Sequence, residues 1–165
     1  DAIIASPFMR ARQTAKIIAK TTNKQLEFSE LFVERRKPSS IYGKPHTDEA
    51  ASKTWHEWHK SFFEGGKVED GENYQETVKR ADNALDYLLS RPEQSLLVVT
   101  HGYFLRAIVA RVLLGNLLSP ESLKRFQRLK AMENTGITAI VYEPAFAEGS
   151  CWRVWIYNDH AHLAE

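Results

Sequence analysis

Residues 95–102 read Ser-Leu-Leu-Val-Val-Thr-His-Gly, and they indicate the fold class of the chain. Its uninterrupted apolar run is typical of an interior parallel strand, which is buried on both faces. Residues 103–114 continue with apolar positions broken by arginines, a pattern that predicts a partly buried helix. A buried strand that leads directly into a helix is the unit of α/β proteins. We therefore expect His101 and Gly102 at the turn beyond the carboxyl end of the strand.

The chain opens with a second unit of this kind. Ala-Ile-Ile-Ala at 2–5 predicts a buried strand, Ser6 suits the N-cap of a helix, and Pro7 suits its first position. Apolar residues then recur at helical spacing to about Lys20. This unit places Arg10 one helical turn beyond the end of its strand, from where the side chain can reach back over the sheet edge.

The remaining elements are of both types. Helices are predicted over 47–63, 73–89 and 120–130, strands over 26–33, 137–142 and 152–157, the last two as a hairpin, and an irregular loop over 34–47. We therefore expect a three-layer α/β/α fold whose mostly parallel sheet is covered by helices on both faces. The length of 165 residues fits one domain with its own core.

Composition excludes several classes of function. The net charge of +1 provides no overall attraction to nucleic acid or to an anionic membrane. The most apolar stretch, 103–118, is interrupted by arginines and is not a membrane span. Cys151 is the single cysteine, so no internal disulfide forms, and we expect a reducing, cytoplasmic location. Neither nucleic acid nor membrane is expected as a partner.

Ligands of open α/β sheets bind beyond the carboxyl ends of the strands, and polar residues follow two of the predicted strands. Gly102 allows the backbone to approach a ligand closely, and the helix after His101 offers free N–H groups that suit a phosphate. The guanidinium of Arg10 suits bidentate binding of phosphate oxygens, although for this residue alone a solvated helix position is the simpler interpretation. The sequence therefore predicts one cationic cradle for a phosphoryl group, formed by Arg10 and His101.

Glu34 begins a charged segment that continues with Arg35, Arg36 and Lys37. Judged from the residues alone, Glu34 is an ordinary surface carboxylate, since a proton donor at this position needs burial or a nearby phosphate dianion. The three cations either remain in solvent or favour an additional anionic group on a ligand, and both interpretations stay open.

Aromatic and histidine side chains gather in the helix predicted at 47–63. Trp55 and Trp58 share one helical face, which packing explains, although they are also candidates for an apolar wall of a ligand pocket. His56 and His59 lie in the same segment, but no third ligand is evident and the spacing of zinc proteases is absent. We therefore expect no metal site.

Together these segments resemble the histidine phosphatase superfamily, the phosphoglycerate mutase-like proteins. Residues 6–15, Ser-Pro-Phe-Met-Arg-Ala-Arg-Gln-Thr-Ala, are similar to its S-x-L-x-R-A-x-x-T-A motif, and residues 97–102 are similar to its V-x-H-G motif. Residues 71–73, Gly-Glu-Asn, resemble its G-E-S element, with asparagine in place of the serine. Residues 134–138 resemble the element that opens the following strand. The resemblance spans nearly the whole chain.

The resemblance implies a role for each candidate residue. Arg10 corresponds to the phosphate-binding arginine, His101 to the second active-site histidine, and Glu34 to the proton donor, while Gly102 is expected to contact the phosphate. The implied activity is hydrolysis of a small phosphomonoester through a phosphohistidine, without a metal or a cofactor. A phosphoglycerate mutase and a non-catalytic phospholigand-binding module stay open as alternatives, and so does a homodimer.

One motif of the family has no counterpart in these residues. The leading L-x-R-H-G motif supplies the nucleophilic histidine, another phosphate-binding arginine and a central strand, and no Arg-His-Gly sequence occurs here. We therefore expect residues 1–165 to be a single histidine phosphatase-like domain without its N-terminal strand and R-H-G segment. The chain alone is expected to be inactive, and exposed sheet edges are expected to reduce its stability.

Overall fold

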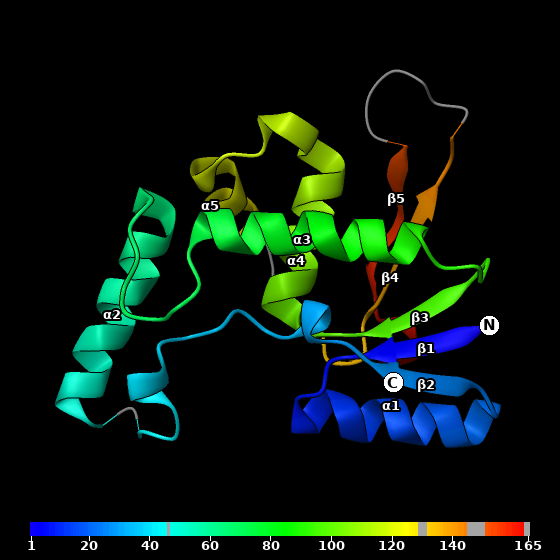
Figure 1. The fold of residues 1–165 in the computed structure, drawn as a ribbon, viewed down its shortest axis with the longest axis horizontal. Coiled ribbons are helices and arrows are strands. Elements are labelled where there is room, and N and C mark those ends of the chain that lie inside the picture. Colours follow the sequence, from blue (N-terminus) through cyan, green and yellow to red (C-terminus); the bar gives the residue numbers. More distant parts are fainter. Residues whose placement is uncertain (46, 129–131, 145–150, 164–165) are drawn as a thin grey trace.

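The chain folds into α-helices and β-strands joined by loops, as the sequence predicts (Figure 1). The structure is a computed structural model that describes residues 1–45, 47–128, 132–144 and 151–163. The strands are β1 (Ala2–Ala5), β2 (Gln25–Phe28), β3 (Leu96–Val99), β4 (Ile137–Tyr142) and β5 (Trp152–Asp159). The helices are α1 (Met9–Thr22), α2 (Glu49–Glu64), α3 (Tyr74–Leu89), α4 (Gly102–Leu114) and α5 (Pro120–Arg128). None of the described helices is both long and apolar enough to cross a membrane.

A parallel sheet of order β2-β1-β3 forms the centre of the fold. Ile3 of β1 is in register with Leu26 of β2 and Leu97 of β3, and β1 is buried along its whole length. On one face Ile3 and Ala5 pack against α1, and on the other face Ile4 joins a core shared with α3 and α4. Figure 1 shows α1 on one side of this sheet and α3 on the other. The predicted three-layer α/β/α fold is therefore confirmed.

The strands β4 and β5 form an antiparallel hairpin, which has no ladder to the parallel sheet among the described residues. Leu96 and Val98 of β3 pack against the core around α4. Ile140 of β4 and Val154 of β5 pack against the same core. Within the described residues, the parallel sheet and the hairpin therefore share one core, but no strand ladder joins them.

β3 lies at an edge of the parallel sheet, where the sequence predicts an interior strand. Within the described part of the chain only β1 pairs with it, and Leu97 remains 45% exposed. The prediction is wrong on this point for a physical reason. An apolar run does not indicate which strands pair with the two edges of a strand, and it does not by itself ensure that every side chain on the two faces is covered.

The first helix begins at Met9, two residues later than predicted. The backbone N–H of Ser6 still donates to the carbonyl of Val99 in β3 at 2.9 Å, which keeps the chain extended at this point. The N-cap residue of α1 is Phe8, so the predicted N-cap at Ser6 is wrong. Oγ of Ser6 accepts the N–H of Phe8 at 3.2 Å, before the helix begins.

Two further boundaries follow from local capping. The strand predicted over 26–33 ends at Phe28, because Ser29 accepts a backbone N–H and starts a short 3-10 turn. The helix predicted from residue 47 begins at Glu49, because the side chain of Asp48 accepts the N–H of Ala51 and caps α2. The predicted end of the helix at 120–130 lies outside the described residues.

Gly71 lies in a contact too close for a side chain. A Cβ atom at this position would lie 2.8 Å from Cδ of Pro38 and 2.8 Å from Cδ1 of Trp58, and both atoms belong to rigid rings. We therefore expect Gly71→Ala to lower the free energy of unfolding by about 1–3 kcal/mol, measured by urea denaturation. The control is Gly102→Ala, whose Cβ would meet Met132 Cβ at an ordinary 3.8 Å. Equal stability of the two variants would contradict the prediction.

Candidate active site

His101 connects the ends of β1 and β3. It occupies the N-cap position of α4 in an extended conformation, so it lies just beyond the carboxyl end of β3. The residue is buried, and its Nε2 lies 2.8 Å from Oγ of Ser6, which follows β1. Its ring centre lies 5.4 Å from that of Phe8. Ser6 and Phe8, which follow β1, therefore fix the imidazole that follows β3. The contact between Ser6 and His101 was not predicted from the sequence.

Arg10 approaches the same place from α1. Its guanidinium carbon lies 5.8 Å from the centre of the Phe8 ring, the ring that also contacts His101. Burial lowers the pKa of His101 most, and the positive charge of Arg10 lowers it further. The structure thus brings Arg10 and His101 together around Phe8, at the carboxyl ends of β1 and β3.

The Glu34 carboxylate lies on the first turn of α4, next to His101. Its Oε1 accepts the N–H of Arg35 at 3.0 Å and that of Phe104 at 3.1 Å, and its Oε2 accepts the N–H of Tyr103 at 3.3 Å. The interpretation of Glu34 as an ordinary surface carboxylate is therefore wrong, because backbone donors of a second element hold its half-buried side chain. The negative charge of Glu34 opposes the effects that lower the pKa of His101.

The N-terminus of α4 is less open than the sequence predicts. Two N–H groups of its first turn, those of Tyr103 and Phe104, donate to Glu34. An anionic ligand beside His101 and Gly102 would therefore lie next to this carboxylate.

Arg35 is enclosed by aromatic rings. Its guanidinium carbon lies 3.6 Å from the centre of a Trp58 ring, 4.7 Å from that of Phe62 and 4.5 Å from that of Tyr103. Its Nη1 donates to the hydroxyl of Tyr103 at 3.2 Å. Trp58 is itself buried, and its Nε1 donates to the carbonyl of Glu72 at 3.0 Å. Packing between α2 and the preceding loop therefore accounts for Arg35 and Trp58.

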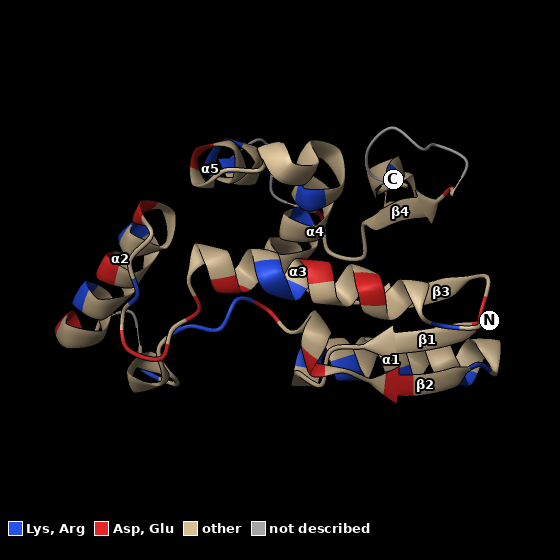
Figure 2. Ribbon diagram, turned by 45° about the horizontal axis from the view of Figure 1, so that its top comes forward, with Lys and Arg blue, Asp and Glu red and all other residues tan. Residues whose placement is uncertain are grey.

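The other two cations of this segment have partners at the surface. Arg36 pairs with Glu30 at 3.3 Å, and the ammonium of Lys37 lies 5.1 Å from the centre of the Tyr42 ring. The loop that carries this basic run passes alongside α3 (Figure 2). These contacts account for both side chains without a ligand.

The aromatic and histidine side chains of α2 pack mainly on one another. Trp55 is 37% exposed and stacks on His59 with a ring distance of 5.1 Å. Nδ1 of His56 lies 2.7 Å from the carbonyl of Ser52. In the part of the chain that the structure describes, no group of three or more histidine, cysteine, aspartate and glutamate side chains is placed to hold a metal ion.

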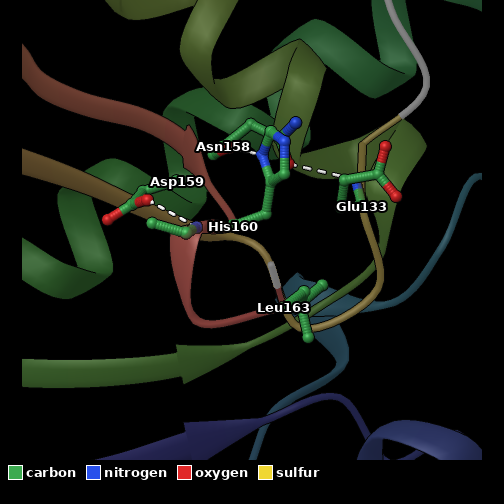
Figure 3. Close-up of a pocket in the computed structure, with 6 residues that line it drawn as sticks. Glu133, Asn158, Asp159, His160 and Leu163 are labelled. Atoms are coloured by element: carbon green, nitrogen blue, oxygen red, sulfur yellow. Dashed lines mark hydrogen bonds between the residues drawn. The ribbon is translucent and has the colours of Figure 1, made fainter. Parts of the chain in front are cut away.

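A pocket at the end of β5 lies near the turn at Gly102. Figure 3 shows the residues that line it, which are Glu133, Asn158, Asp159, His160, Ala161 and Leu163. The N–H of Glu133 donates to Oδ1 of Asn158 at 3.0 Å, which fixes this segment against β5. The preceding Met132 is the neighbour that a Cβ on Gly102 would meet. The segment that opens β4 therefore borders the candidate site.

The environment of His101 implies a pH dependence of stability. Burial and the charge of Arg10 lower its pKa in the folded chain, whereas the unfolded chain titrates near the ordinary value of about 6.5. Below that pH the unfolded state binds more protons, so the free energy of unfolding should fall as pH decreases from about 7 to about 5. Urea denaturation of His101→Gln should show a smaller decrease over this range. An equal decrease in both proteins would contradict the assignment.

The parallel sheet, the helices on both faces and the polar residues beyond β1 and β3 define an α/β protein of the phosphoglycerate mutase-like fold. The family model of the histidine phosphatase superfamily (branch 1) matches residues 1–154. The chain belongs to this superfamily, as the motifs around Arg10 and His101 suggest.

Two relatives have similar sequences. A probable phosphoglycerate mutase GpmB of Erwinia tasmaniensis is 29% identical over 174 residues, which cover 99% of this chain and 73% of that protein. A probable phosphoglycerate mutase GpmB of Enterobacter sp. (strain 638) is 32% identical over 165 residues, which cover 98% of this chain and 72% of that protein.

Solved structures share the fold. Bacillus stearothermophilus YhfR has a TM-score of 0.76 at 22% identity, over 99% of this chain and 76% of that one. The alpha-ribazole phosphatase from Shigella flexneri has a TM-score of 0.70 at 18% identity, over 96% of this chain and 73% of that one.

Proposed function

We propose that this chain forms the larger part of a phosphatase that hydrolyses small phosphomonoesters through a phosphohistidine intermediate. The observation that carries the proposal is the meeting of Arg10, His101 and Glu34 beyond the ends of β1 and β3. Arg10 and His101 can supply positive charge, and Glu34 can supply a proton. Phosphoryl transfer to and from a protein nucleophile requires both. Membership of the histidine phosphatase superfamily supports the same chemistry.

In the first step, a histidine nitrogen attacks phosphorus and the bond between phosphorus and the leaving oxygen breaks. Arg10 and a protonated His101 hold the non-bridging oxygens and offset the charge that spreads over them. Glu34, protonated at this stage, gives its proton to the leaving oxygen, so that a neutral alcohol departs. Glu34 then takes a proton from the water that attacks the phosphohistidine, and inorganic phosphate is released.

In this proposal the nucleophilic histidine lies outside residues 1–165. The arrangement of the strands supports this location of the histidine. In the described residues β3 has one unpaired edge, and the parallel sheet and the β4–β5 hairpin pack on the same core without a ladder between them. A strand that paired there in parallel with β3 would end beside His101 and would deliver an R-H-G turn to the cradle. Residues 1–165 would then be the remainder of a single domain.

A phosphoglycerate mutase is the second candidate. The names of the two sequence relatives favour it, since both are probable phosphoglycerate mutases. Such an enzyme would use the same cradle but would return the phosphoryl group to the substrate instead of passing it to water. The two candidates therefore differ in the acceptor of the phosphoryl group and not in the residues that hold it.

The test is turnover of p-nitrophenyl phosphate in EDTA by the product of the reading frame that extends upstream to an R-H-G segment. We expect turnover and an acid-labile, alkali-stable phosphoenzyme in that protein, and neither in the 165-residue chain. Strict dependence on a metal ion, or full turnover by the 165-residue chain, would contradict the mechanism. Interconversion of phosphoglycerates that needs 2,3-bisphosphoglycerate would select the mutase, and phosphate binding without turnover would select a non-catalytic module.

A further inference from the structure

Glu72 and Arg80 form a buried ion pair between the loop before α3 and α3 itself. Nε of Arg80 donates to Oε1 of Glu72 at 2.7 Å, and Nη2 donates to Oε2 at 2.7 Å, which is bidentate geometry. The side chains of Arg80 and Glu72 are only 8% and 6% exposed. A buried ion pair gains little stability over apolar residues of similar volume, because both charges lose their hydration. Stability alone therefore does not account for this pair.

Arg80 holds the chain on the N-terminal side of Glu34. Its Nη1 donates to the carbonyls of Leu31 at 3.1 Å and of Val33 at 2.8 Å. Its guanidinium carbon lies 3.7 Å from the centre of the Phe104 ring. The N–H of the same Phe104 donates to the Glu34 carboxylate. Arg80 therefore contacts both the segment that carries Glu34 and a residue that receives its side chain.

Glu72 holds the chain on the C-terminal side of Glu34. Its Oε2 accepts the N–H of Arg36 at 3.1 Å, and its own N–H donates to the carbonyl of Arg36 at 2.7 Å. The chain between Val33 and Arg36 belongs to no helix or strand, so these bonds set its path. We name the two paired side chains the Glu72–Arg80 clamp.

We propose that the Glu72–Arg80 clamp positions the Glu34 carboxyl group for proton transfer to the leaving oxygen. This inference rests on the proposed function, in which Glu34 is the acid. Proton transfer requires that the carboxyl group lie within hydrogen-bond distance of the leaving oxygen, and a displacement of about 1 Å is enough to slow such a step strongly. Glu72 and Arg80 contact no reacting atom in this scheme, so both are positioning residues.

The identity of the leaving group separates positioning of the acid from a general structural role. p-Nitrophenolate is a weak base and departs without a proton, whereas an alkoxide is a strong base and needs one. Loss of the position of Glu34 should therefore lower kcat/KM for an alkyl phosphate and leave kcat/KM for p-nitrophenyl phosphate almost unchanged, because kcat/KM reports the steps up to departure of the alcohol and not the later attack of water. General distortion of the site should slow both reactions equally.

The experiment compares Arg80→Lys and Glu72→Gln with the unaltered protein that contains the R-H-G segment. Lysine keeps the charge but cannot reach the carboxylate and two carbonyls at once, and glutamine keeps an acceptor but loses the bidentate ion pair. We expect kcat/KM for glycerol 2-phosphate to fall at least about tenfold, and kcat/KM for p-nitrophenyl phosphate to change by no more than about twofold.

Arg111→Lys is the matched control. Nε of Arg111 in α4 donates to Oδ1 of Asp82 in α3 at 2.6 Å. The other hydrogen bonds of Arg111 in the described part of the chain go to Gly115 and Asn116, far from residues 31–36 in the sequence. We expect Arg111→Lys to change kcat/KM for both substrates by the same factor. An equal fall of kcat/KM for both substrates in the clamp variants would overturn the inference. Absence of turnover in the unaltered protein would instead count against the proposed function.

Amide hydrogen exchange of the 165-residue chain provides a readout that does not need activity. The N–H of Arg35, which donates to Glu34, should exchange at least about tenfold faster in the clamp variants than in Arg111→Lys. If Arg80→Lys does not fold, the milder Glu72→Gln is tested for the same two results, which are the selective fall of kcat/KM for glycerol 2-phosphate and the faster exchange of the Arg35 N–H. Unchanged exchange at Arg35 in a folded clamp variant would show that the clamp does not fix this segment, and would overturn the inference.

Discussion

In the catalytically complete protein, His101→Ala is expected to lower kcat/KM for p-nitrophenyl phosphate about a thousandfold. The imidazole is 6% exposed, and its Nε2 is fixed by Ser6 at 2.8 Å, so little of its charge would be screened by water. In the proposed mechanism it is a cation in the transition state, favoured there by the phosphoryl group. Alanine removes that charge and also the ring that packs on Phe8.

The matched control for this prediction is His56→Ala. His56 is exposed on α2, and its Nδ1 lies 2.7 Å from the carbonyl of Ser52, so its loss removes a histidine without touching the cradle. We expect its kcat/KM to stay within about twofold of the unaltered value. A loss below about tenfold in His101→Ala would show that His101 does not hold the phosphoryl group, and the proposed function would lose its main support.

Local patterns were enough to predict where two of the candidate residues lie, which is just beyond strand ends. The apolar run over 96–99 and the following glycine place His101 between a strand and a helix, and the short strand at 2–5 places Arg10 on the next helix. The rule that parallel strands present their carboxyl ends at one edge then predicts that the two residues meet. Edge pairing depends on distant strands, so the position of β3 in the sheet did not follow from its own sequence.

The surroundings of Glu34 could not be predicted because they join distant parts of the chain. Its bonds to the N–H groups of Tyr103 and Phe104 link residues 69 and 70 positions apart. The position of Arg80 in the sequence could have indicated a buried ion pair, which was not predicted. Arg80 lies on the buried stripe of α3, one turn from Thr77, where an arginine must find an internal carboxylate or carbonyl partner.

Arg80→Ala is expected to lower the free energy of unfolding by about 3–5 kcal/mol, measured by urea denaturation of the 165-residue chain. The Glu72 carboxylate, whose side chain is 6% exposed, would lose its bidentate cation and keep only the N–H of Arg36 as a donor. The carbonyls of Leu31 and Val33 would lose a donor in the same step. Removal of one member of a buried ion pair lowers the free energy of unfolding strongly for this reason, even though the intact pair contributes little to it.

Two further variants decide whether this cost belongs to the buried charge. Arg80→Met combined with Glu72→Met should recover the part of the loss that comes from the unpaired Glu72 charge, because neither charge is then buried. The part that comes from the carbonyls of Leu31 and Val33, which still lack their Arg80 donor, should remain. Arg111→Ala breaks a more exposed pair, in which the side chains of Arg111 and Asp82 are 23% and 40% exposed, and should cost about 1 kcal/mol. If Arg80→Ala costs no more than this, water reaches Glu72. The pair would then be too loosely held to position Glu34, so the stability measurement also tests the proposed role of the clamp.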